Sequence, residues 1–468
     1  KILKNTMNYT LRPYQEECKK VGLAVLRDSK GRKEVAILPT AWGKAVVIAF
    51  MAKELTDGRV LVLQPNIDLL NQGIEKLESI GAKYSVYSAS ANRKETEENL
   101  IYATPKSITY KVFKDLNIKY VIVDECDFSS KPDSEMVKLL NKLNIKSCLG
   151  LTASPFYLEN TVDGAVTRMM HKVKKSFFTD ICFVTQISEL VDNGYWSEIQ
   201  YFDVFDHSKQ SILKLNTSGS EYSEESQKSF YEACDLKNKI ASFLSRLPEN
   251  ENALVFVPSI QDAEELRNII PNSVAIHSKI SKKQRKECVE GLKKEIYKVG
   301  ITPLALTVGY DHPNLRNIVD ATPTNSVRLH LQKTGRLIRI CEGKDFGRVI
   351  DFAGNIKKHG DVRDLNFEFI EGYGWGLFKK DELLSDIPMN LDKVYTKEYL
   401  KNSGKIKLEY AFGEHNPGTE KLDFGTNKGK TVKELYYKKR HYLKWLAESN
   451  FEFKNKKLEA QIKDIWKL

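Results

Sequence analysis

The sequence predicts an α/β protein with two similar parallel-sheet lobes and a small basic domain after them. Between about residues 34 and 155, short β-branched runs alternate with helical stretches, and this alternation implies a parallel sheet with right-handed crossovers. The same alternation resumes from about residue 238 to residue 352. A chain of 468 residues with 41% apolar content has room for about three domains.

The elements of the first lobe follow from these runs. Strands are expected at 35–38, 60–63, 120–123 and 147–151. Helices are expected at 67–79 and within 187–195, where Gly194 provides a C-terminal stop. The polar stretch 160–175 predicts a loop or a hairpin, and 208–227 predicts a solvated connector before a helix at 229–247. We place the first lobe at 1–200, the connector at 201–237, the second lobe at 238–360 and an accessory domain at 361–468.

The run Tyr120-Val121-Ile122-Val123 ends in two adjacent carboxylates, Asp124 and Glu125. Such a run is typical of a buried parallel strand, and open α/β sheets place their ligand sites at the carboxyl ends of the strands. Asp124 is therefore placed to hold a magnesium ion and Glu125 to orient or deprotonate a water. Alone, the pattern fits an ordinary strand end equally well.

A second signal lies upstream, in the loop Pro39-Thr40-Ala41-Trp42-Gly43-Lys44-Ala45 between an apolar strand and an apolar helix. Backbone amides and the helix dipole at such a junction bind phosphate, and Lys44 can reach the β and γ phosphates. Ala45 stands where a phosphate loop normally has Ser or Thr as a magnesium ligand, and Ala41 stands where glycine is usual. The missing hydroxyl predicts weaker metal binding and slower turnover.

A third signal is Gln332-Lys333-Thr334-Gly335-Arg336-Leu337-Ile338-Arg339. We expect the two arginines on one face of a helix, from which a guanidinium could stabilise charge on a transferring γ-phosphate. The alternative is a plain basic helix face.

Together these segments resemble the superfamily 2 helicases and translocases of the Asp-Glu-x-His type, most closely DNA branch-migration and repair helicases. The resemblance covers about residues 8 to 360 and implies two RecA-like motor lobes that clamp ATP and magnesium. Asp127 departs from the usual histidine of the box, which leaves the type of nucleic acid open.

The resemblance also implies roles for individual residues. The catalytic group would be Glu125, Lys44, Arg336, Arg339 and Gln332. ATP would be bound by Arg12, Gln15, Thr40, Gly43, Lys44, Asp124, Gly309 and Asp311, with Asp124 as the magnesium ligand. Nucleic acid would be contacted by Pro65, Asn66, Gln72, Thr104, Lys106, His277, Ser278 and Thr302, and 151–155 would couple hydrolysis to movement.

The C-terminal segment is basic and aromatic, with 13 Lys and Arg against 6 Asp and Glu over 421–468. Lys428 and Lys430 in a glycine-lysine turn, followed by Tyr442 and Trp445, suit phosphate contact and base stacking. A small domain with an aromatic core and a solvated lysine surface is the equal alternative.

The formal charge of +11 favours a polyanionic partner, although simple solubility also accounts for it. No apolar run approaches a membrane span and no secretory signal is visible. Seven scattered cysteines without a Cys-x-x-Cys pair predict reduced thiols and no metal besides magnesium. We expect a monomer in the cytoplasm of a bacterial or phage-infected cell.

The function that the resemblance implies is an ATP-dependent DNA helicase acting on single-stranded, forked or branched DNA. Two alternatives stay open. One is a double-strand translocase that does not separate strands, and the other is a nucleic-acid clamp whose ATPase is impaired by Ala45.

Overall fold

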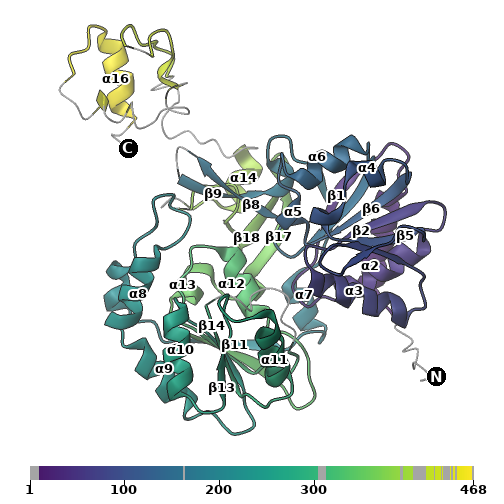
Figure 1. Cartoon of the computed structure of the whole chain (residues 1–468). Helices are drawn as coiled ribbons and strands as arrows, with labels where there is room; N and C mark the ends of the chain where they lie inside the picture. The colour runs from purple at the N-terminus through teal and green to yellow at the C-terminus, as the bar shows by residue number, and fades with distance from the viewer. Residues whose placement is uncertain are drawn as a thin grey trace, which may run out of the picture.

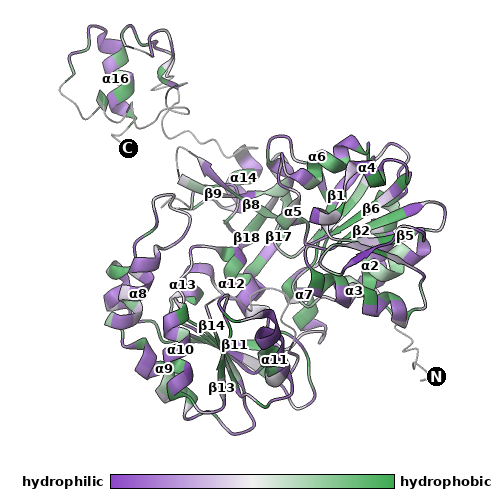
Figure 2. Ribbon diagram, viewed as in Figure 1, coloured by the Kyte–Doolittle hydropathy of each residue, from purple (hydrophilic) through white to green (hydrophobic). Residues whose placement is uncertain are grey.

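The computed structural model describes residues 10–161, 164–303, 312–389, 394–403, 418–425, 427–433, 435, 443, 446–447 and 451–465 (Figure 1). It confirms the two parallel-sheet lobes. Figure 2 shows mainly hydrophobic strands in both sheets and mixed hydrophobic and hydrophilic surfaces on the helices that cover them. No helix in this described part of the chain has the length and apolar character needed to cross a membrane.

The first sheet has the strand order β10-β1-β7-β6-β2-β5-β3-β4 and is parallel except for the β3–β4 pair. Its strands are β1 (Lys33–Ile37), β2 (Arg59–Leu63), β3 (Ser85–Ser88), β4 (Arg93–Lys94), β5 (Leu100–Ala103), β6 (Ile118–Asp124), β7 (Ser147–Thr152) and β10 (Asp180–Val184). Its helices are α1 (Pro13–Leu26), α2 (Lys44–Glu54), α3 (Ile67–Ser79), η1 (Pro105–Ser107), α4 (Tyr110–Phe113), α5 (Cys126–Ser129), α6 (Glu135–Lys142), η2 (Met170–Lys172) and α7 (Ile187–Asp192). Because β1, β7 and β6 are neighbours and parallel, the loops after them meet at one edge.

The second sheet has the order β11-β16-β15-β12-β14-β13, and all its pairs are parallel. Its strands are β11 (Glu198–Asp203), β12 (Ala253–Phe256), β13 (Ser273–Ala275), β14 (Val299–Thr302), β15 (Asn317–Asp320) and β16 (Phe346–Asp351). Its helices are η3 (His207–Ile212), α8 (Glu224–Ala233), α9 (Leu236–Leu244), α10 (Ile260–Ile269), α11 (Lys282–Lys293), α12 (Val327–Thr334) and α13 (Asn355–His359).

Two features of the second lobe differ from the sequence expectation. β11 spans the expected boundary at residue 200, because Ile199 and Phe202 pair with Gly347 and Ile350 of β16 and make β11 the edge strand of this sheet. The helix expected at 229–247 is broken into α8 and α9, because Asp235 adopts a left-handed conformation with φ 51°.

The segment expected to open a separate accessory domain at 361 packs against the two lobes instead. It contains η4 (Val362–Asp364), an antiparallel sheet of β17 (Leu365–Ile370), β18 (Gly374–Lys379) and β19 (Glu382–Leu383), and α14 (Lys397–Ser403). Leu365, Phe367 and Leu377 belong to the large hydrophobic core that runs from the first lobe into the second, and the Phe367 ring stacks on Phe156 of the first lobe with centroids 5.6 Å apart. The Gln186 side chain also donates to the Phe367 carbonyl at 2.7 Å.

The polar stretch expected as a loop or hairpin is the hairpin of β8 (Phe156–Thr161) and β9 (Gly164–Met169). Asp386 anchors it, because the carboxylate accepts from the Met169 amide at 2.9 Å and pairs with Lys172 at 3.1 Å. The described residues from 418 onward, including α16 (Lys456–Asp464), have a hydrophobic core of their own and lie apart from both lobes in Figure 1.

Candidate functional site

One cavity of about 230 Å³ lies between the lobes and is lined by all five predicted catalytic residues. The first lobe lines it with Thr40, Ala41, Trp42, Gly43, Lys44, Ala45, Val46, Leu69, Gln72, Lys76, Asp124, Glu125, Phe128 and Ala153, and the second lobe with Gln332, Arg336 and Arg339. We call it the nucleotide cavity. The fold therefore brings the glycine-lysine loop, the carboxylate pair and both arginines to one place.

The loop after β1 is held by hydrogen bonds from outside it. Gln15 donates from Nε2 to the Trp42 carbonyl at 3.0 Å, and the buried Trp42 indole donates from Nε1 to Thr185 Oγ1 at 3.0 Å. Gly43 has φ 94°, and a Cβ at this position would lie 2.6 Å from Gln15 Nε2. The left-handed backbone conformation at this position therefore favours glycine. Ala41, where glycine is usual, also has a positive φ of 65°.

Gln15 and Arg12, which we expected to bind ATP, lie outside the cavity that holds the other predicted residues. Gln15 is buried, and its Oε1 accepts from the Arg12 amide at 3.0 Å while its Nε2 holds the loop. The Arg12 guanidinium lies 5.2 Å from the centroid of the Tyr195 ring. Neither residue lines the nucleotide cavity, so Gln15 acts here as a support for the phosphate loop.

The charges in the cavity are balanced within the first lobe. Lys44 Nζ forms an ion pair with Glu125 Oε1, and the Glu125 amide donates to Asp124 Oδ1 at 3.0 Å. Burial raises the pKa of the Asp124 carboxyl to about 6, against the opposing effect of Lys44. Burial alone would lower the pKa of the Lys44 ammonium, but the Glu125 and Asp124 carboxylates outweigh it and the pKa is raised. At neutral pH the site therefore offers an anionic Asp124 to a cation, whereas Lys44 has to leave Glu125 to reach a phosphate.

Asp127, which departs from the box histidine, connects three segments. It is buried, and its carboxylate accepts from Thr152 Oγ1 at 2.7 Å and from Ser154 Oγ at 3.2 Å. Arg328 Nη2 of the second lobe lies 2.5 Å from Asp127 Oδ2. The pKa of Asp127 is raised because burial outweighs the attraction of Arg328. The box is thus linked both to the strand end at β7 and to α12 across the lobe boundary.

Arg328 and Lys76 were not predicted as site residues, although both carry a spacing signal in the sequence. Arg328 lies four residues before Gln332, and Lys76 lies four residues after Gln72. Side chains four residues apart share one face of a helix, so each could have been grouped with its neighbour.

The expectation that Arg336 and Arg339 lie on a helix face is wrong. α12 ends at Thr334, and the Gly335 amide caps it by donating to the Leu331 carbonyl at 2.9 Å. A Cβ at Gly335 would lie 2.8 Å from that carbonyl and 3.0 Å from the Thr40 side chain. The chain turns beyond the helix, where Lys344 donates to the Arg339 carbonyl at 2.9 Å, and both arginines still line the cavity.

The predicted nucleic-acid contacts of the first lobe lie in three different places. Pro65, Asn66 and Lys106 line a separate cleft of about 540 Å³, together with Pro105, Phe128, Ser134, Glu135 and Met136, and we call it the strand cleft. Gln72 lines the nucleotide cavity instead. Thr104 is buried, and its hydroxyl lies in hydrogen-bond contact with Ser88 at 2.9 Å and Ser107 at 2.8 Å, which gives it a structural role.

In the second lobe, His277 is buried with Nε2 at 2.8 Å from Glu264 Oε1, and Thr302 is fully buried at the end of β14. Both face protein, whereas Ser278 is exposed. Gly309 and Asp311 lie outside the described residues, as do Tyr442 and Trp445. Lys428 and Lys430 are exposed on the C-terminal unit.

Two family models match the chain. The model of the type III restriction enzyme res subunit matches residues 8–157, and the model of the helicase conserved C-terminal domain matches residues 236–341. "Putative helicase 22" of Sulfolobus islandicus filamentous virus is 26% identical over 324 residues, with 66% of this chain and 53% of the relative covered. ATP-dependent DNA helicase Q1 of Pongo abelii is 20% identical over 357 residues, with 69% and 48% covered. The chain spans about half the length of these relatives.

Solved structures share the fold. A fragment of "a putative HsdR subunit of a type I restriction enzyme from Vibrio vulnificus YJ016" has a TM-score of 0.55 at 18% identity, covering 75% of this chain and 66% of that one. The type ISP restriction-modification enzyme LlaBIII, solved bound to DNA, has a TM-score of 0.52 at 16% identity, covering 74% and 28%. With both family segments in the same order on two parallel-sheet lobes, the chain belongs to the superfamily 2 helicases.

Proposed function

We propose that this chain is an ATP-driven motor that moves along DNA and unwinds or remodels forked or branched DNA. The observation that carries the proposal is the nucleotide cavity, where Lys44 and Glu125 of one lobe and Arg336 and Arg339 of the other line a single space. A net charge of +11 and the relative named as a DNA helicase support a nucleic-acid substrate.

Each residue has a role that its position supports. Lys44 and the first amides of α2 bind the phosphates, and Glu125 orients or deprotonates the attacking water. Arg336 and Arg339 stabilise the charge that develops on the γ-phosphate. Asp124 offers a buried carboxylate, which suits magnesium, since this ion is commonly bound through one or two carboxylates together with substrate phosphates. A bound magnesium ion would neutralise part of the phosphate charge.

Movement would follow from the division of these groups between the lobes. Closure brings the arginines of the second lobe towards the phosphates held by the first, and opening after hydrolysis releases them. The Lys44 to Glu125 ion pair has to open in each cycle, because both groups are needed for separate tasks. Contacts to the phosphate backbone would make strand binding tolerant of sequence and sensitive to salt.

The test is Glu125→Gln, which removes the carboxylate without removing bulk. We expect turnover to be lost while ATP and DNA binding persist, and we expect Arg336→Ala to slow hydrolysis by about a thousandfold. Glu95→Gln is the matched control, since Glu95 pairs with Arg93 at the edge of the first sheet. Assays of the wild type with single-stranded, duplex and forked DNA and with RNA assign the substrate. Normal hydrolysis by Glu125→Gln would show that another residue activates the water.

A second candidate is a double-strand translocase that does not separate strands. It is favoured by the match to the type III restriction enzyme res subunit and by the fold shared with two restriction enzymes. Displacement of a triplex-forming strand without unwinding of a fork would identify such a translocase. Unwinding of the fork would identify a helicase.

A further inference from the structure

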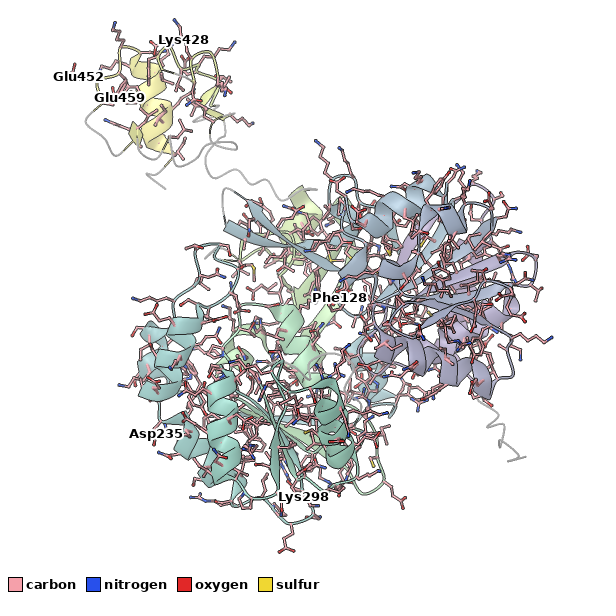
Figure 3. The ribbon with its side chains drawn as sticks, in the orientation of Figure 1. Phe128, Asp235, Lys298, Lys428, Glu452 and Glu459 are labelled. Carbon is pink, nitrogen blue, oxygen red and sulfur yellow. The ribbon has the colours of Figure 1, made fainter. Side chains whose placement is uncertain are left out.

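Phe128 follows the carboxylate box directly, and its side chain is 49% exposed although Cys126 and Asp127 before it are buried. It lines both the nucleotide cavity and the strand cleft. Figure 3 labels Phe128 where the first lobe faces the second. An exposed aromatic ring between these two cavities has no role in the chemistry assigned above.

The Phe128 ring contacts the guanidinium of Arg328, which belongs to the second lobe. The guanidinium carbon of Arg328 lies 4.6 Å from the centroid of the Phe128 ring. The same guanidinium pairs with Asp127 at 2.5 Å, and Asp127 accepts from Thr152 at 2.7 Å. The stacked pair is therefore fixed by a buried carboxylate on one lobe and by α12 on the other.

The strand cleft beside Phe128 combines features that suit a polyanion with apolar surfaces. α3 and α6 begin at its edge, with Asn66 and Ser134 as their N-caps, so backbone amides of both first turns lie close to it. Lys106 adds an exposed cation, and Pro65 and Met136 add apolar surface. Amides at helix N-termini and lysines bind phosphates, whereas apolar and aromatic surfaces receive bases.

We propose that Phe128 is a stacking platform for an unpaired nucleobase of the bound strand, with Arg328 supporting the opposite face of the ring. The inference rests on the proposed function in that it takes a nucleic-acid strand as the occupant of the strand cleft. A base stacked on a phenyl ring gains affinity without sequence preference, and an adjacent guanidinium adds a cation–π contribution. Because Arg328 belongs to the second lobe, opening or closing the lobes changes the support behind the ring.

The experiment compares two oligonucleotides of equal length in the absence of ATP: a normal single-stranded DNA and a fully abasic strand with the same phosphates. We expect Phe128→Ala to weaken binding of the normal strand by about tenfold or more and to leave the abasic strand unaffected. Phe128→Tyr should restore the affinity. Phe202→Ala is the matched control, because Phe202 is 46% exposed but lies on the edge strand β11.

A second readout is fluorescence of 2-aminopurine placed within the strand, which is quenched when the base stacks and should be less quenched with Phe128→Ala. The proposal is overturned if Phe128→Ala loses the same affinity for both strands or loses none for either. It is also overturned if the wild type binds the normal and abasic strands equally well. If DNA stimulates ATP hydrolysis by the wild type but Phe128→Ala binds the normal strand as tightly as the wild type does, only this inference is rejected. A base-dependent loss in a protein that hydrolyses no ATP would reject the proposed function and keep the inference.

Discussion

Ala45 is the residue at which this chain departs most clearly from a standard phosphate loop. It follows Lys44 in the first turn of α2 and lines the nucleotide cavity, but its methyl group brings no oxygen to a metal ion. Under the proposed function, Asp124 would therefore hold a magnesium ion with less help from the protein than a serine or threonine at position 45 would give.

We expect Ala45→Ser or Ala45→Thr to raise strand-stimulated ATP hydrolysis tenfold or more, since each decade corresponds to about 1.4 kcal/mol of barrier. The magnesium concentration that gives half the maximal rate should fall in the same variants. Steady-state kinetics over a magnesium series measure both effects. Unchanged or lower rates in both variants would mean that the missing hydroxyl does not limit the enzyme.

At the scale of elements, α12 and α13 are joined by two buried histidines. His330 Nε2 lies 3.0 Å from the Gly360 carbonyl, His359 Nε2 lies 3.0 Å from the Thr324 carbonyl, and the rings are 5.2 Å apart. Burial lowers the pKa of His330 to about 4 and also lowers the pKa of His359. Both imidazoles are therefore neutral in the folded lobe at neutral pH, where each can donate one hydrogen bond.

This pair predicts loss of stability in acid. Below pH 6.5 His330 of the unfolded chain binds a proton, whereas His330 of the folded lobe does not bind one until about pH 4. The free energy of unfolding therefore falls as the pH falls from about 6.5 to about 4. At pH 5 the titration of His330 lowers the free energy of unfolding by about 2 kcal/mol relative to neutral pH. His330→Gln keeps a donor near the Gly360 carbonyl but does not titrate, so its melting temperature should fall less between pH 7 and pH 5 than that of the wild type.

The wild type has to be compared with His330→Gln because Asp351 changes the free energy of unfolding with pH in the opposite direction. Burial raises the pKa of Asp351 to about 7, so its contribution to stability is lost as the pH rises from about 4 to 7. Asp351 is present in both proteins, and the difference between their melting curves isolates His330. Parallel curves for the wild type and His330→Gln would contradict the prediction.

At the scale of the whole molecule, the motor extends beyond the second parallel sheet. A chain ending at His359 would remove Leu365, Phe367 and Leu377 from the hydrophobic core shared by the two lobes, at about 1.5 to 3 kcal/mol each. A chain ending at Ser403 would keep them together with α14. We expect the longer truncation product to keep the full-length melting temperature and ATPase, and the shorter one to lose about 5 kcal/mol or more. Thermal melting and ATPase assays of the two products test this.

We expect the C-terminal unit, which contains the described residues from 418 onward, to strengthen binding to forked DNA. Removal of the residues after 403 should lower fork affinity and make binding depend less steeply on salt. Lys428→Ala with Lys430→Ala in the full chain should reduce the slope of log K against log salt by up to about 1.8, at about 0.9 for each lost phosphate contact. Equal affinities and slopes for the full chain and the product ending at Ser403 would assign the unit to protein contacts instead.

The sequence by itself determined the elements whose signals are local. The strand β6 and the carboxylates at its end, the loop before α2 and the helix α3 lie where periodicity and adjacent residues predict them. Such signals are reliable because strand pairing and helix burial impose a period on neighbouring side chains. The two parallel-sheet lobes follow from the repeated alternation of these elements.

Only the tertiary structure decided which distant side chains meet. Arg328 reaches Asp127 across the lobe boundary, Gln72 faces the nucleotide cavity, and the strand containing Phe367 packs on Phe156. The arginines reach the cavity from a turn because Gly335 ends α12 where Thr40 of the other lobe approaches. Contacts of this kind depend on how sheets and helices pack in three dimensions, and no pattern of neighbouring residues along the chain encodes them.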